Sequence, residues 1–199
     1  MGKRYLFLWF VVFVLGVVPL LAFAGVPTEQ IKGTTDKIIS ILTDPDLKGP
    51  SQAEKRRALI RKTADERFDW QEMSRRSLGR HWTKLNEEER KTFVNLFSQL
   101  LERTYMEKVE DYSGEKVTYI GDTVDGDYAT VEMKVLTSKN VDIPVVNKVK
   151  KNGEQWMIYD VSIEGVSLVN NYRTQFNSIL SKSSFSELLA KLREKVSEK

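Results

Sequence analysis

The stretch 155–180, QWMIYDVSIEGVSLVNNYRTQFNSIL, constrains the fold most, because it joins a strand to a helix through a very short turn. Its first half has a period of two that predicts a strand, with one side formed by Met157, Tyr159, Val161 and Ile163 and the other by Trp156, Ile158, Asp160 and Ser162. Gly165 ends the extended run, and Ser167 is a suitable N-cap for the helix. The apolar residues of that helix share one side: Leu168, Val169, Tyr172, Phe176, Ile179 and Leu180. We expect this side to pack on the apolar face of the same sheet.

Three further segments with a period of two precede this strand, at 117–120, 128–136 and 141–150. The first connection, 121–126, is rich in Asp and Gly, and the last, 151–153, is Lys-Asn-Gly, so both predict turns. In the second segment, Thr130, Glu132 and Lys134 face away from an apolar side formed by Ala129, Val131, Met133 and Val135. Consecutive strands joined by short turns predict a four-stranded antiparallel meander.

Six helices complete the prediction, counting the one that follows the last strand. One begins at Pro27, and a second begins at a capping box formed by Ser51 and Glu54, with so few apolar residues that we expect it on the outside. A short helix at 70–78 is capped by Asp69, and the longest runs from Asn86 to about 112. The remaining helix begins at Ser184, which makes two helices after the sheet. The predicted fold class is therefore α+β: a bent four-stranded antiparallel sheet with N-terminal helices and two C-terminal helices that enclose an apolar pocket.

The first 24 residues have the pattern of a targeting segment. Lys3 and Arg4 precede an apolar run at 5–21, and Ala22-Phe23-Ala24 has the small residues of a cleavage site. This pattern predicts a cleavable signal peptide at 1–24 followed by a single domain at 25–199, with a retained N-terminal anchor as the alternative. The chain has no cysteine, so a fold exported to an oxidising compartment must be stabilised by packing alone.

Composition excludes several kinds of chemistry. His81 is the single histidine, so a two-histidine metal site cannot form, and a serine triad would depend on that one side chain. The 11 glycines are scattered and form no phosphate-binding loop. A net charge of +3, which falls when Lys3 and Arg4 are removed, does not indicate a nucleic-acid partner. We therefore expect neither a metal nor a cofactor.

Two groups of charged residues remain as candidates for function. Asp160 lies within the last strand, where it could act as a general base or could pair with a cation such as Lys148. Arg75, Arg76 and Arg80 could form a docking patch for an acidic partner or a lipid phosphate, or simply a solvated helix face.

The chain resembles the MlaC-type proteins, also called toluene-tolerance or ABC-transporter auxiliary-component proteins, over nearly its whole length after residue 24. In the C-terminal part the resemblance lies in Trp156, Ile158, Tyr159-Asp160-Val161, Glu164-Gly165-Val166-Ser167-Leu168-Val169, Tyr172-Arg173 and Gln175-Phe176. In the N-terminal part it lies in Phe68-Asp69, Met73, Leu78-Gly79, Trp82, Glu88, Arg90, Phe93, Phe97, Leu100-Leu101, Thr104-Tyr105 and Tyr112.

The resemblance implies a soluble periplasmic phospholipid carrier that is not an enzyme. It further implies a bent sheet with helices around a pocket for acyl chains, with the head group near the surface. The implied partners are an outer-membrane lipoprotein complex and an inner-membrane ABC transporter complex with its substrate-binding ring protein. Two alternatives stay open: an enzyme that uses Asp160 as its base, and a periplasmic adaptor that holds no ligand.

Side-chain alternation gives a hypothesis for the lipid-binding residues. The long helix would contribute Leu96, Phe97, Leu100 and Tyr105. The sheet and the start of the following helix would contribute Val131, Met133, Val145, Tyr159, Val161, Val166, Val169 and Tyr172. Methionine suits such a pocket, because its flexible thioether adapts to chains of different shape.

Overall fold

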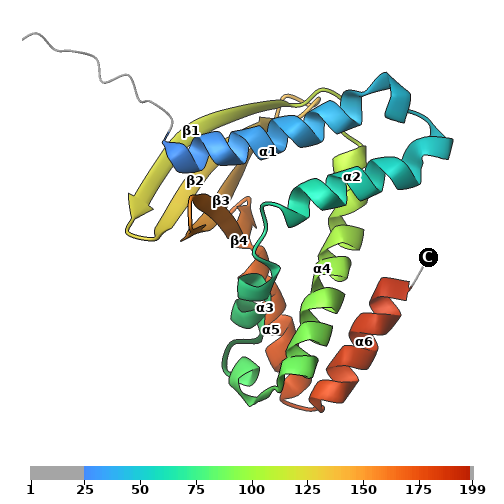
Figure 1. The fold of residues 1–199 in the computed structure, drawn as a ribbon, viewed down its shortest axis with the longest axis vertical. Coiled ribbons are helices and arrows are strands. Elements are labelled where there is room, and N and C mark those ends of the chain that lie inside the picture. Colours follow the sequence, from blue (N-terminus) through green and yellow to red (C-terminus); the bar gives the residue numbers. More distant parts are fainter. Residues whose placement is uncertain (1–24, 198–199) are drawn as a thin grey trace, which may run out of the picture.

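The computed structural model describes residues 25–197, in which a five-stranded sheet is combined with six α-helices (Figure 1). The helices are α1 (Val26–Thr43), α2 (Ala53–Asp65), α3 (Trp70–Leu78), α4 (Glu87–Glu110), α5 (Leu168–Leu180) and α6 (Phe185–Ser197). The strands are β1 (Lys116–Asp125), β2 (Tyr128–Leu136), β3 (Asp142–Asn152), β4 (Gln155–Ile163) and β5 (Val166–Ser167). Three short 3-10 helices are η1 (Pro45–Leu47), η2 (Pro50–Gln52) and η3 (Gly79–Lys84). The predicted signal peptide lies outside the described residues.

The strand order β1-β2-β3-β4-β5, antiparallel throughout, confirms the α+β class and the meander. The predicted turn at 121–126 is wrong, because β1 continues to Asp125. Ile120 is left without a partner in β2, and this bulge lets the pairing resume at Gly121, opposite Glu132. Asp and Gly therefore occur inside a strand here. The fifth strand is a two-residue addition that pairs Val166 with Ile163.

A second bulge changes which side chains of β4 share a face. Lys148 pairs with Asp160 and Val149 with Ile158, which leaves Tyr159 as the extra residue. An extra residue moves every later side chain to the opposite face. Trp156 and Ile158 therefore lie on the same side as Val161, and the uninterrupted alternation expected for this strand is wrong.

Helix α1 covers this face of the sheet and builds one hydrophobic core with it (Figure 1). The core contains Ile31, Ala129, Val131, Met133, Val149, Trp156 and Ile158. The start of α1 is tied to β1, because the Thr28 hydroxyl donates a hydrogen bond of 2.6 Å to Asp122. Helix α1, and not the long helix α4, therefore packs on this face of the sheet.

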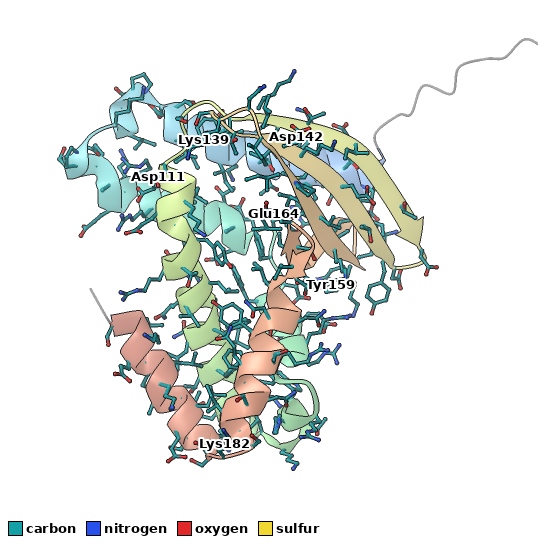
Figure 2. The ribbon with its side chains drawn as sticks, turned by 180° about the vertical axis from the view of Figure 1, so that it is seen from behind. Asp111, Lys139, Asp142, Tyr159, Glu164 and Lys182 are labelled. Carbon is teal, nitrogen blue, oxygen red and sulfur yellow. The ribbon has the colours of Figure 1, made fainter. Side chains whose placement is uncertain are left out.

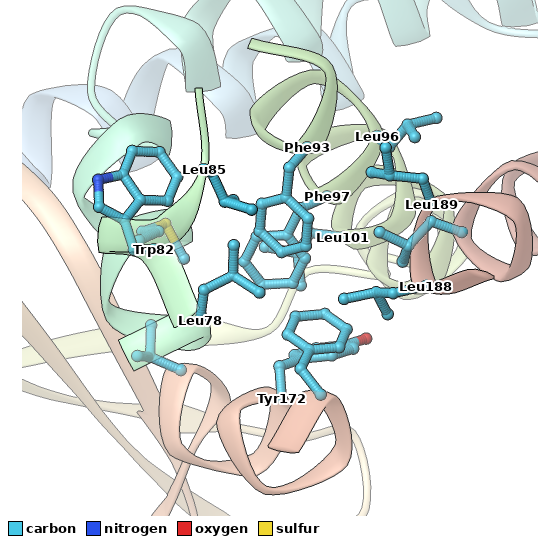
Figure 3. Close-up of a cluster of buried hydrophobic side chains, with 14 residues drawn as sticks. Leu78, Trp82, Leu85, Phe93, Leu96, Phe97, Leu101, Tyr172, Leu188 and Leu189 are labelled. Carbon is cyan, nitrogen blue, oxygen red and sulfur yellow. The ribbon is translucent and has the colours of Figure 1, made fainter. Parts of the chain in front are cut away.

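A second, separate hydrophobic core is formed by helices (Figure 3). Its members come from α3, η3, α4, α5 and α6: Met73, Leu78, Trp82, Leu85, Phe93, Leu96, Phe97, Leu101, Val169, Tyr172, Phe176, Leu188, Leu189 and Leu192. Phe97 packs edge to face against Tyr172 and Phe176, with ring centroids 5.1 and 5.5 Å apart. The expectation that α5 packs on the sheet is wrong, since its apolar side faces α3, α4 and α6. These helices extend away from the sheet (Figure 1).

Local caps place the helix ends largely as predicted. Asn86 and Glu89 form a capping box, and the side chain of Asp69 accepts a hydrogen bond from the backbone N–H of Glu72. Ser167 caps α5 in the same way. The expected box at Ser51 is wrong, because a 3-10 turn occupies that position and α2 starts at Ala53 without a side-chain cap. Within the described residues, no helix combines the length and hydrophobicity needed to cross a membrane.

Candidate functional site

An apolar cavity of about 290 Å³ lies between the two hydrophobic cores. Phe68, which precedes α3, packs against both cores and stacks on Trp70 with ring centroids 4.9 Å apart. The segment that carries Phe68 is held to β4, since Asp69 N–H donates to the carbonyl of Ile158 and Ile158 N–H donates to that of Arg67, each at 2.8 Å. The cavity is therefore framed by fixed backbone on this side.

Six elements contribute to the wall. The apolar residues are Ile38 of α1; Ile60 and Ala64 of α2; Trp70 and Met73 of α3; Leu101, Tyr105, Met106 and Val109 of α4; Val161 and Ile163 of β4; and Leu168 of α5, together with Phe68. Arg61 and Glu102 also border the cavity, but the exposed part of its wall is apolar. A water molecule needs two or more polar partners, so such a space favours hydrocarbon over water.

A second hollow of about 460 Å³ continues from the cavity along the sheet. Ile38 and Val109 line both spaces, so the two adjoin. The second hollow lies between α1, the end of α4, and strands β1 and β2, and Met133 and Val135 form part of its floor. Together the two spaces offer an elongated apolar surface, which matches the shape of an acyl chain more closely than that of a compact solute.

The structure brings some of the predicted lipid-binding residues to these spaces and places others elsewhere. Tyr105 and Val161 line the cavity, and Met133 lines the adjoining hollow. Val131 and Val145 belong to the sheet core or pack against it. Five others belong to the helical core or pack against it: Leu96, Phe97, Leu100, Val169 and Tyr172.

Tyr159 and Val166 lie outside both cavities. Tyr159, the bulged residue of β4, has the guanidinium of Arg76 4.0 Å from its ring centre and the ring of Tyr128 5.9 Å away. Figure 2 shows Tyr159 and Glu164 near the junction of the sheet with α5. Val166 follows Glu164 and Gly165 in the turn after β4, and its side chain is 57% exposed.

Sequence reasoning missed the contribution of α2. Helix α2 lies mostly on the outside, as expected, but Ile60 is buried and lines the cavity with Ala64 one turn later. On α4, the lining residues Leu101, Tyr105 and Val109 recur every four residues. Both spacings were visible in the sequence, but neither distinguishes a cavity wall from a packed helix.

Asp160 has a structural role. Its carboxylate is buried and accepts hydrogen bonds from the Ser167 hydroxyl at 2.7 Å and from the backbone N–H of Val169 at 3.1 Å. Lys148 Nζ lies 3.9 Å away, as the ion-pair alternative predicts. Both carboxylate oxygens are therefore engaged in hydrogen bonds that join β4 to the start of α5. His81 lies within hydrogen-bonding distance of Asn177, at 2.9 Å.

The arginines of α3 are held largely by one carboxylate of the same helix. Glu72 accepts hydrogen bonds from Arg75 at 2.6 and 2.7 Å and from Arg76 at 2.8 Å. The bonds from Arg75, and after them those from Arg76, outweigh burial and lower the pKa of Glu72 to about 2. Much of the charge of these two arginines is therefore balanced within α3.

The fold and the site together define the class of this protein. It is an α+β protein with a curved antiparallel sheet, covering helices and an apolar cavity between its two hydrophobic cores. The family model described as MlaC protein matches residues 32–194. This chain belongs to the MlaC family.

One relative and one solved structure are similar to this chain. The intermembrane phospholipid transport system binding protein MlaC of Haemophilus influenzae is 26% identical over 127 residues, which cover 61% of this chain and 59% of that protein. A phospholipid-binding protein from Ralstonia solanacearum, solved in complex with a phospholipid, superimposes with a TM-score of 0.76 at 24% identity, covering 85% of this chain and 96% of that chain. At that identity the second likeness establishes the fold.

Proposed function

We propose that this protein is a soluble periplasmic carrier of phospholipid, which it moves between an outer-membrane lipoprotein complex and an inner-membrane ABC transporter complex with its substrate-binding ring protein. The apolar cavity between the two cores carries the proposal. The similarity to the Haemophilus phospholipid transport protein and to the Ralstonia phospholipid-binding protein supports it.

The energetics of transfer explain why an apolar cavity is the essential part of such a carrier. Burial of each methylene from water contributes about 0.8 kcal/mol of stabilisation. Exposure of two acyl tails of about 15 methylenes each would therefore cost on the order of 24 kcal/mol. A carrier that crosses an aqueous compartment must offer a comparably dry environment. It must also release the lipid, so the free energy of the bound lipid must lie close to that in the donor and acceptor.

The experiment is extraction and identification of bound lipid from the purified chain beginning at residue 25. We expect phospholipid in stoichiometric amount from the wild type. Val161→Trp fills the cavity and should reduce the extracted lipid several-fold, because the large indole occupies the space of a tail. Ile120→Trp is the matched control, since Ile120 is 54% exposed on β1 and lines neither apolar space. A folded wild type that carries no phospholipid and takes none from vesicles would contradict the proposal.

A further inference from the structure

Helix α2 is joined to α4 by arginine–carboxylate pairs on the side where both helices wall the cavity. Most of the close backbone contacts of α2 are with α1, η1 and η2. Towards α4, Arg56 and Arg57 pair with Glu110 at 2.6 and 2.7 Å, and Arg61 pairs with Glu102. Of these pairs, Arg61–Glu102 borders the cavity and closes it between the two helices.

Arg61 is the centre of this closure. Its Nε donates to Asp65 at 2.8 Å, its Nη1 donates to Glu102, and its Nη2 donates to the Ser98 hydroxyl at 3.1 Å. Its guanidinium lies 5.5 Å from the ring centre of Trp70, and the Trp70 indole N–H also donates to Asp65, at 2.7 Å. Burial acts to lower the pKa of Arg61, but the hydrogen bonds to Asp65 and Glu102 outweigh it and raise that pKa. The charged guanidinium of Arg61 thus lies beside the apolar cavity.

On its outer side the same closure borders a polar groove. Glu102 and Met106 line both the apolar cavity and a groove of about 550 Å³ on the protein surface. Arg57, Arg103 and Glu107 also line the groove. The apolar cavity and a groove that carries charges of both signs therefore lie on two sides of Glu102 and Met106, and Arg61 borders the cavity beside them.

This juxtaposition matches the chemistry of an amphiphile whose head group carries both a phosphate and an amine. We infer that the Arg61–Glu102 pair is the head-group site of the cavity, where a zwitterionic phospholipid replaces the internal ion pair with its phosphodiester on Arg61 and its ammonium on Glu102. The guanidinium fork suits a phosphate, which it can bind through two hydrogen bonds. A purely anionic head group would leave Glu102 without a cation and close to a second negative charge, which opposes binding.

The inference deepens the proposed function and rests on it. It also gives the ion pair a role in the empty protein. With no lipid present, Arg61 and Glu102 satisfy each other, so neither charge is left unpaired at the edge of an apolar space. The lipid then exchanges one set of charge pairs for another, which keeps the free energies of the empty and loaded forms close.

The test measures binding of phosphatidylethanolamine and phosphatidylglycerol of identical acyl chains to the delipidated protein, presented in vesicles. We expect the wild type to prefer phosphatidylethanolamine. Glu102→Gln should reduce this preference about tenfold, because it removes one charge-assisted hydrogen bond to the ammonium. Glu102→Asp retains the carboxylate and should retain the preference. Glu88→Gln is the charge-matched control, since Glu88 is exposed on α4 and lines neither the cavity nor the groove.

The outcomes separate this inference from the proposed function. A wild type that binds neither lipid contradicts the carrier proposal itself. A wild type that binds both lipids equally, or a Glu102→Gln variant with an unchanged preference, overturns the head-group inference alone. The thermal midpoint of each variant shows that the comparison is made between folded proteins. Soluble glycerophosphoethanolamine, which has the head group without tails, should not compete at the lipid concentrations used, and competition by it would overturn a site that depends on the adjoining cavity.

Discussion

The carboxylate of Asp160 in β4 accepts a hydrogen bond of 3.1 Å from the backbone N–H of Val169 in the first turn of α5. Its other oxygen accepts the hydroxyl of Ser167, and that hydroxyl oxygen in turn accepts the backbone N–H of Asn170 at 3.1 Å. One buried carboxylate thus fixes the direction in which α5 leaves the sheet. The helical core depends on that direction, because α5 supplies Tyr172 to it.

This arrangement predicts that Asp160→Ala destabilises the protein more than Ser167→Ala does. The first change leaves a buried N–H and a partly buried hydroxyl without their acceptor and should cost about 2–3 kcal/mol, whereas loss of the cap alone costs about 1 kcal/mol. Urea unfolding of both variants measures the difference. Equal stability of Asp160→Ala and the wild type would show that the carboxylate does not hold the junction.

The ion pairs of Glu72 predict a pH-dependent contribution to stability. Its folded pKa of about 2 lies below the ordinary value of 4.5, so the ionised carboxylate stabilises the fold above pH 4.5 and loses that effect as the pH falls towards 2. Glu72→Gln should lower the free energy of unfolding at pH 7 by about 1 kcal/mol, since Arg75 is partly solvated. Urea titrations from pH 7 to pH 2 should show the two proteins converging below pH 4.5. A difference that stayed constant with pH would contradict this origin.

Gly79 ends α3 in a conformation that other residues adopt only with strain. Its φ is +53° and its ψ −124°, and a Cβ built there would meet nothing closer than a side-chain atom of Arg173 at 3.9 Å. The cost of Gly79→Ala is therefore expected to come from the backbone alone, at about 1–3 kcal/mol. Ala58→Gly, at an exposed position within α2, provides a comparison in which only flexibility is added, at about 1 kcal/mol. A thermal midpoint for Gly79→Ala equal to that of the wild type would exclude the strain.

Substitutions in the helical core and in the cavity should have different effects on stability and on lipid content. Phe97 is 1% exposed and packs on the rings of Phe93, Tyr172 and Phe176, so Phe97→Ala should cost about 3–5 kcal/mol. Val161→Trp enters existing space and should change stability by less than about 1.5 kcal/mol while lipid content falls. Denaturant midpoints and lipid extraction on the same samples make the comparison. If Val161→Trp unfolds the protein as easily as Phe97→Ala does, the cavity is not open space.

The predicted lipid-binding residues show what the spacing of apolar residues can and cannot predict. Tyr105 and Leu96 both lie on the apolar side of α4, yet Tyr105 borders the cavity and Leu96 belongs to the helical core. Hydrophobic spacing predicts that a side chain is turned inward, but not which of two cores it enters. Alternation predicts that Val166 lines the pocket, but Val166 is exposed, because the tight turn that contains Glu164 and Gly165, both with positive φ, places it in the short edge strand.

By itself the sequence determined the helix starts at Asp69, Asn86, Ser167 and Ser184, because a cap and the N–H that it binds are only two or three residues apart. It also determined the four main strands and their order. Only the tertiary structure decided the bulges at Ile120 and Tyr159, the packing of α5 away from the sheet, and the meeting of Arg61 with Glu102. These features depend on pairings between residues far apart in the chain, and their energies exist only once the two cores have formed with the cavity between them.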